Sequence, residues 1–298
     1  MKKVITLLGF TILFLTNCFK DLDYDLDFEG QEIVIRGTIS PQDGAIIQVS
    51  HTLDPEGTYF FDTLDLNINN AIVKLYANDT LLQQISYSGK NGLYLEEDLT
   101  LNRNVAYHLT VEVEGFPSAR TEKIEIPQLP QTTFNLVRED ENELRIDIEV
   151  ADNPKASYYQ LVANGYYDME VVELYAYPIG TYEQWEICGL IETGSSNGFH
   201  ITDDCFKEKT FLFPLSVQIE YFQPSLDSSL FFIEPIIVEE VTLRFRSTIK
   251  ERYDFVVTSD VPEGIDNAFR EPAITFSNVI GGHGYFSAYQ ETVYIHKL

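Results

Sequence analysis

The chain has 298 residues, 44% of them hydrophobic and 13% aromatic, which is enough to bury the cores of two modules and argues against overall disorder. Asp and Glu total 47 against 20 Lys and Arg, giving a net charge of −27 at pH 7. A chain this acidic repels phosphate backbones, so nucleic acid is excluded as a partner. Cationic partners or divalent cations suit such a charge, although a solvated acidic surface is its commonest meaning.

The first 17 residues have the organisation of a signal peptide. A basic start at residues 1–3 leads into an apolar run over 4–15, which is too short to span a bilayer. Leu15-Thr16-Asn17-Cys18 resembles a lipobox, whose cysteine becomes the acylated first residue of the mature protein. We predict a signal peptide over 1–17 and a covalent lipid, palmitate included, on Cys18. The alternative is a cleaved secretory peptide with an incidental cysteine.

An acidic tether over residues 18–30 follows the signal peptide. Lys20 is followed by Asp21 and Asp23, and this order resembles the surface-export signal of Bacteroidota lipoproteins. The resemblance implies a lipid-anchored protein of the outer membrane that faces the cell exterior. The alternating acids also have EF-hand-like spacing, but Leu26 stands where that turn requires Gly, so calcium is only weakly supported.

Residues 31–127 are expected to form a first β-sandwich. Alternating or β-branched runs, separated by turn residues, occur over 32–39, 45–50, 71–76, 81–87, 92–95 and 106–113. Short strands at this spacing are typical of immunoglobulin-like or transthyretin-like sandwiches. Pro127 and Pro130 stiffen the segment that follows and mark the module boundary.

Residues 131–298 are expected to form a second, fibronectin-like sandwich. Its strands are predicted at 134–137, 144–150, 158–162, 238–247 and 253–258. Residues 166–229 show no clear periodicity and are interpreted as an insertion. Little helix is expected, apart from short turns near 227–228 and 250–253. The predicted fold class is therefore all-β, with two sandwich modules after a lipidated tether.

Cys188 and Cys205 are the remaining cysteines. Because an exported protein meets oxidising conditions, we predict a structural disulfide between them. Between the two lies Gly194-x-Ser196-x-Gly198, which matches the string of a hydrolase nucleophile elbow but lacks the strand and helix that this chemistry needs. We interpret it as the tip of a loop.

The histidines point to no metal or catalytic site. They stand apart, in no ligand spacing, at His51, His108, His200, His283 and His296. His108 alternates with apolar strand residues and is expected to face solvent. The prediction is a protein that is not an enzyme and has neither a cofactor nor a bound metal.

Aromatic residues gather at the start of the predicted insertion. Exposed Tyr and Trp bind sugars or protein partners, but aromatics are also ordinary strand core. A partner or glycan contact is therefore one interpretation, and core packing the other, for Tyr166, Tyr167, Tyr175, Tyr177, Tyr182 and Trp185.

The whole mature chain resembles the Bacteroidota lipoproteins of domain-of-unknown-function family 4249. The most specific part of the resemblance is the closing run Ser277-Asn278-Val279-Ile280-Gly281-Gly282-x-Gly284-Tyr285-Phe286-Ser287-Ala288-Tyr289. Earlier segments contribute Ile33-Val34-Ile35-Arg36-Gly37, Asn70-Ala71-x-Val73-x-Leu75, Tyr107-x-Leu109-x-Val111, Ile126-Pro127, Asp152 with Tyr158-Tyr159, and Phe269-x-Glu271-Pro272. Gly281-Gly282 replaces the polar-Gly pair usual in the family.

Members of this family are often encoded beside TonB-dependent transporters. The resemblance therefore implies a non-enzymatic accessory lipoprotein of such a barrel, or of a related outer-membrane complex, and it carries no catalytic residue. The alternative, from the aromatic residues, is a free-standing glycan-binding or adhesive surface protein. A hydrolase using Ser196 ranks third.

Overall fold

A computed structural model describes residues 30–53, 66–151, 158–168, 170–180, 182–192, 198–205, 210–221, 236–259 and 275–298. The signal peptide, Cys18, Lys20, Asp21 and Asp23 lie outside the described residues, as does Ser196. Among the residues described, no helix is long and apolar enough to cross a membrane.

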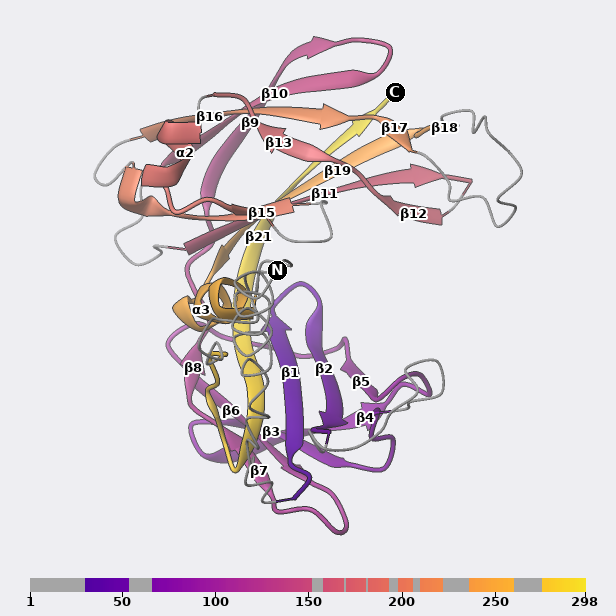
Figure 1. Cartoon of the computed structure of the whole chain (residues 1–298), viewed down its shortest axis with the longest axis vertical. Helices are drawn as coiled ribbons and strands as arrows, with labels where there is room; N and C mark the ends of the chain where they lie inside the picture. The colour runs from indigo at the N-terminus through magenta and orange to yellow at the C-terminus, as the bar shows by residue number, and fades with distance from the viewer. Residues whose placement is uncertain are drawn as a thin grey trace, which may run out of the picture.

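The protein is mostly β-sheet and forms two lobes (Figure 1), which confirms the predicted all-β sandwich class. Alternating burial of side chains accounts for the strands: in β1 (Ile33–Ser40), Ile33, Ile35 and Ile39 are fully buried while Arg36 is exposed. A strand with this pattern needs a core on one side and solvent or a second layer on the other.

The first lobe is built from one sheet that folds round its own core. The strand order is β21-β1-β2-β5-β4-β3-β6-β7-β20, with β8 beside β6, where β21 spans Gly282–Lys297. The strands other than β1 and β21 are β2 (Gly44–His51), β3 (Ile72–Ala77), β4 (Thr80–Tyr87), β5 (Leu93–Glu96), β6 (Ala106–Glu112), β7 (Ala119–Thr121), β8 (Ile124–Glu125) and β20 (Val279–Ile280).

The second lobe packs two sheets face to face. The smaller has the order β13-β16-β10-β9, from β9 (Gln131–Glu139), β10 (Glu143–Ala151), β13 (Ala176–Pro178) and β16 (Thr210–Gln218). The other runs β14-β15-β11-β19-β21, from β11 (Tyr158–Tyr167), β14 (Ile191–Glu192), β15 (Gly198–Thr202) and β19 (Glu240–Thr248), with β12 (Glu170–Glu173) beside β11. A small separate sheet pairs β17 (Glu220–Tyr221) with β18 (Ile236–Ile237).

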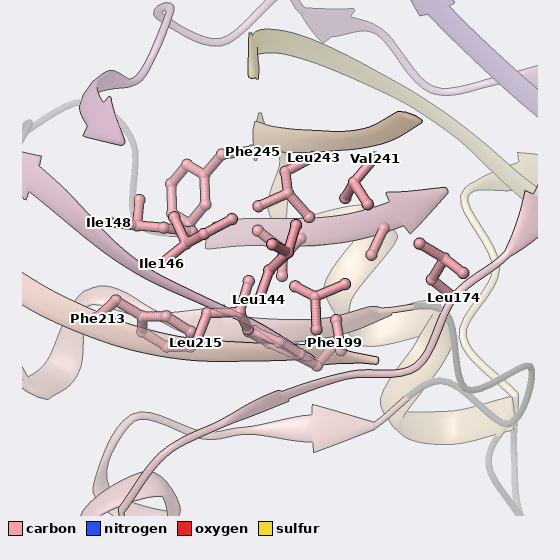
Figure 2. Close-up of a cluster of buried hydrophobic side chains, with 14 of the residues drawn as sticks. Leu144, Ile146, Ile148, Leu174, Phe199, Phe213, Leu215, Val241, Leu243 and Phe245 are labelled. Carbon is pink, nitrogen blue, oxygen red and sulfur yellow. The ribbon is translucent and has the colours of Figure 1, made fainter. Parts of the chain in front are cut away.

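The core of the second lobe fills the space between its two sheets. Figure 2 shows Leu144, Ile146, Ile148, Phe213 and Leu215 from the smaller sheet facing Phe199, Val241, Leu243 and Phe245 from the larger. All of these are at most 1% exposed. Burial of so many large apolar side chains is the main force that holds the sheets together.

One long strand, β21 (Gly282–Lys297), belongs to both lobes (Figure 1). Its first part pairs in parallel with β1, and its second part pairs antiparallel with β19. Phe286 and Ala288, like Val279 of β20, are buried in the core of the first lobe. The predicted division at residues 127–131 assigns the whole closing segment to the second module, whereas Val279, Phe286 and Ala288 pack in the first lobe.

Two α-helices among the described residues lie beside the sheets. They are α2 (Tyr182–Ile187) and α3 (Lys250–Ser259), and a 3-10 turn, η2, covers Asp203–Cys205. The predicted strand at 253–258 is wrong, because these residues lie in α3. Lys250 and Asp254 form an ion pair one turn apart, and Tyr253 donates a hydrogen bond to the carbonyl of Gly189 at 2.9 Å. Tertiary contact overrides the strand preference of Val256-Val257-Thr258 here.

Candidate partner-binding surface and polar sheet face

The aromatic residues of the predicted contact surface lie in different environments. Trp185 is only 6% exposed and packs in the second core, where its ring centroid lies 4.6 Å from that of Phe213. Tyr166 is half-buried at the end of β11, whereas Tyr167 is exposed. The most exposed are Tyr175 and Tyr177, at 59% and 42%. The side chain of Tyr182 lies outside the described residues.

Tyr175 and Tyr177 belong to an edge of the smaller sheet. Within the described part of the chain, β13 pairs on one side only, with β16. The pairing extends beyond β13, because the amide of Gln218 donates to the carbonyl of Tyr175 and that of Ile179 donates to Pro214. Residues two apart on a strand point to the same face, so Tyr177 and Ile179 lie together on the side away from the core.

An apolar pocket of about 390 Å³ adjoins this edge. It is lined by Ile179, Trp185, Ile187, Cys188, Phe211, Leu212 and Pro214. Two of its walls are strongly exposed, Ile187 at 66% and Leu212 at 52%. We call the surface formed by this pocket, Tyr175 and Tyr177 the tyrosine edge. Contiguous exposed apolar and tyrosine side chains are the composition of a protein-binding surface.

Trp185 adds one polar group to the pocket wall. Its indole Nε1 is buried and has no hydrogen-bond partner in the described part of the chain. An indole N–H is a donor only, and leaving it unpaired in a buried position costs free energy. The unpaired indole N–H is therefore a local cost to the stability of this core.

The predicted disulfide begins beside this pocket. Cys188 follows α2, is 1% exposed and accepts a hydrogen bond from the amide of Thr202 at 2.7 Å through its carbonyl. The side chain of Cys205 lies outside the described residues, so its pairing with Cys188 stays a prediction. A link here would tie α2 to η2.

A second feature, missed in the sequence, is a row of polar side chains across the outer face of the larger sheet. His200, Gln160, Arg246 and Glu291 stand opposite one another on β15, β11, β19 and β21. Arg246 Nε donates to Glu291 at 2.8 Å, and Arg244 pairs with the same carboxylate. The Glu291 side chain is 1% exposed, so the row contains a buried ion pair. The alternation of apolar and polar residues along a strand predicts that these side chains face away from the core, but it does not predict that they are buried.

Tyr289 lies two residues before Glu291, on the same face of β21, and contacts both lobes. Its hydroxyl donates to Asp43 of the first lobe, and Arg246 lies over its ring, with Cζ 4.3 Å from the centroid. Burial raises the pKa of Tyr289 to about 12, so the hydroxyl keeps its proton and remains a donor. This contact helps to join the lobes beside their shared strand.

His200 is a neutral base enclosed in the protein. It is 0% exposed, and neither ring nitrogen finds a hydrogen-bond partner within the described residues. Burial first, then the charges of Arg252 and Arg246, lower the pKa of His200 from 6.5 to about 3. His108, expected to face solvent, is instead 7% exposed and stacked on Tyr76 at 4.8 Å, and burial lowers its pKa too.

We expect His200 to make the protein less stable in acid. Since the unfolded chain binds the proton near pH 6.5 and the folded chain only near pH 3, stability falls as the pH drops through this window. The free energy of unfolding of the wild type should fall by about 1.4 kcal/mol more per pH unit than that of His200→Leu. Urea denaturation of both proteins across this range measures the difference, and parallel pH profiles would contradict it.

The other histidines and acidic residues do not form a cluster in the described part of the chain. Among the residues described, no three His, Cys, Asp or Glu side chains gather where they could hold a metal ion. His283 pairs with Glu32 in the first lobe. His296 pairs with Glu139 at 3.1 Å in the second lobe.

Comparison with known proteins places the chain in a family. A search of curated proteins found no match. The profile of a family described as Domain of unknown function (DUF4249) matches residues 20–295, which include both lobes and the shared strand β21. Because the match covers nearly the whole chain, this protein belongs to the DUF4249 family.

Proposed function

We propose that the protein is a non-enzymatic lipoprotein of the outer-membrane surface and an accessory subunit of a TonB-dependent transporter or related outer-membrane complex. The proposed location at the outer-membrane surface rests on the predicted signal peptide, on Cys18 as lipid carrier, and on the predicted export signal at Lys20, Asp21 and Asp23. The accessory role rests on membership of the DUF4249 family, for which the resemblance implies an accessory lipoprotein of such a transporter. The covalent lipid is the one attached group proposed.

The tyrosine edge is the observation that supports a partner role best. It combines two exposed tyrosines, Tyr175 and Tyr177, with exposed Ile187 and Leu212 around a pocket. Tyr is enriched among residues that dominate binding energy, because its rigid ring loses little entropy on contact and its hydroxyl finds a partner. We place the barrel, or cargo held against it, on this surface. A disulfide between Cys188 and Cys205 would stiffen the pocket wall.

The test is a mild-detergent pulldown from native outer membranes through a carboxy-terminal tag, with mass spectrometry of the proteins recovered. The wild type should bring down a TonB-dependent barrel in stoichiometric amount. The double variant Tyr175→Ala, Tyr177→Ala should recover about tenfold less barrel or lower still, as expected for two residues that carry binding energy.

Tyr87→Ala is the matched control, because Tyr87 is a 37% exposed strand tyrosine of the first lobe. It should recover as much barrel as the wild type. Equal recovery by all three proteins would move the contact away from the tyrosine edge. A wild-type protein that repeatedly purifies alone would overturn the accessory role and favour the glycan-binding alternative, to be tested with the same double variant on glycan arrays.

A further inference from the structure

A second cavity lies where the long sheet passes from one lobe to the other. It encloses about 190 Å³ and is lined by Thr38, Ile46, Gln160, Arg246, Thr248, Arg252, Ser287 and Tyr289. Ile46, Thr38 and Ser287 form one row across β2, β1 and β21, and Tyr289 and Thr248 form the next. Each lobe thus contributes one wall, and β21 is the floor between them.

The charged residues of the lining are both arginines, although the chain as a whole carries a net charge of −27. Arg246 is fixed in place: Nε donates to Glu291 at 2.8 Å, Nη1 contacts Gln160 at 3.4 Å, and the guanidinium lies over the Tyr289 ring. A guanidinium has five N–H donors, so these two bonds leave further donors for the cavity. Glu291 is shared with Arg244 and balances only part of this charge.

Arg252, in the first turn of α3, has no carboxylate within ion-pair distance in the described part of the chain. Its guanidinium lies over the Tyr285 ring, with Cζ 4.9 Å from the centroid. An aromatic face orients the planar group without neutralising it. The cavity therefore has an excess of positive charge and two oriented hydrogen-bonding forks.

We propose that this cavity binds a small organic carboxylate between Arg252 and Arg246. Guanidinium forks match the planar carboxylate in a two-bond geometry. Thr38 and Ser287 share one hydrogen bond at 3.5 Å, so one of their two hydroxyls is left as a further donor. The volume corresponds to about six water molecules, which suits an acid of a few carbon atoms. Ile46 provides an apolar wall that the carbon skeleton of an organic acid uses and an inorganic oxyanion does not.

The experiment is isothermal titration of the full-length protein in detergent with succinate, with its neutral diamide, and with inorganic phosphate. Succinate should bind saturably, with a Kd of about 1 mM or tighter, and the diamide should not bind. Arg252→Gln should weaken succinate binding at least about tenfold, since the charge-assisted fork is lost. Arg252 makes no ion pair with any residue described, and the variant loses only its contact with the Tyr285 ring, so the melting temperature should fall by about 4 °C at most.

Arg120→Gln is the control, because Arg120 is an exposed strand arginine on β7, away from the cavity. It should bind succinate as the wild type does, so that a general charge effect is separated from the cavity. Failure of succinate to bind, or equal loss in both variants, would overturn the site. Phosphate binding in place of succinate would overturn the assignment of the carboxylate. None of these outcomes depends on a transporter partner.

Discussion

Gly284→Ala should lower the free energy of unfolding by about 3–5 kcal/mol. Gly284 lies in β21 beside β1, at φ +104°, a conformation that residues with a side chain rarely adopt. A Cβ built there would lie 1.9 Å from the carbonyl oxygen of Ile35. The strands would have to separate at the parallel pairing that encloses the first core.

Gly115→Ala separates the two causes of this loss. Gly115 has a similar φ of +88°, but a Cβ there would meet no atom within 4 Å. Its replacement should cost only the backbone strain, about 1 kcal/mol. Urea denaturation of the two variants and the wild type gives both values. Equal destabilisation would mean that the close approach of β1 to Gly284 does not constrain the fold.

The glycines also show what could be foreseen from the sequence. The closing run from Ser277 to Tyr289 is recognisable from the sequence as a family feature. The role of its glycines depends on a partner strand about 250 positions earlier in the chain. Within the run, the side-chain amide of Asn278 both donates to and accepts from the backbone of Phe286, at 2.9 and 2.8 Å. A parallel pairing between chain ends leaves no local pattern, because periodicity reports only which face is buried.

The candidate sites were predictable to different degrees. The exposed residues Tyr175 and Tyr177 belong to the predicted aromatic contact set. Trp185 belongs to the same set but is buried in the core. Local sequence does not distinguish the two, because burial depends on which sheet covers the side chain. Arg246 and Glu291 were not foreseen at all. In the sequence each is an ordinary charged strand residue. Only the strand register shows that the two lie opposite one another and form a buried pair.

Glu291→Gln should lower the free energy of unfolding by about 3 kcal/mol or more. The carboxylate is 1% exposed and is held by both Arg244 and Arg246, and an amide cannot neutralise two partly buried guanidinium groups. Glu112→Gln is the matched control, because Glu112 pairs with Lys74 at 3.0 Å on the surface of the first lobe. Exposed strand pairs of that kind contribute about 1 kcal/mol or less. Urea denaturation should therefore give a loss for Glu291→Gln several times that for Glu112→Gln. If the two losses are alike, water screens the Glu291 pair as it does the surface one, and the polar row across β19 and β21 contributes little to joining the lobes.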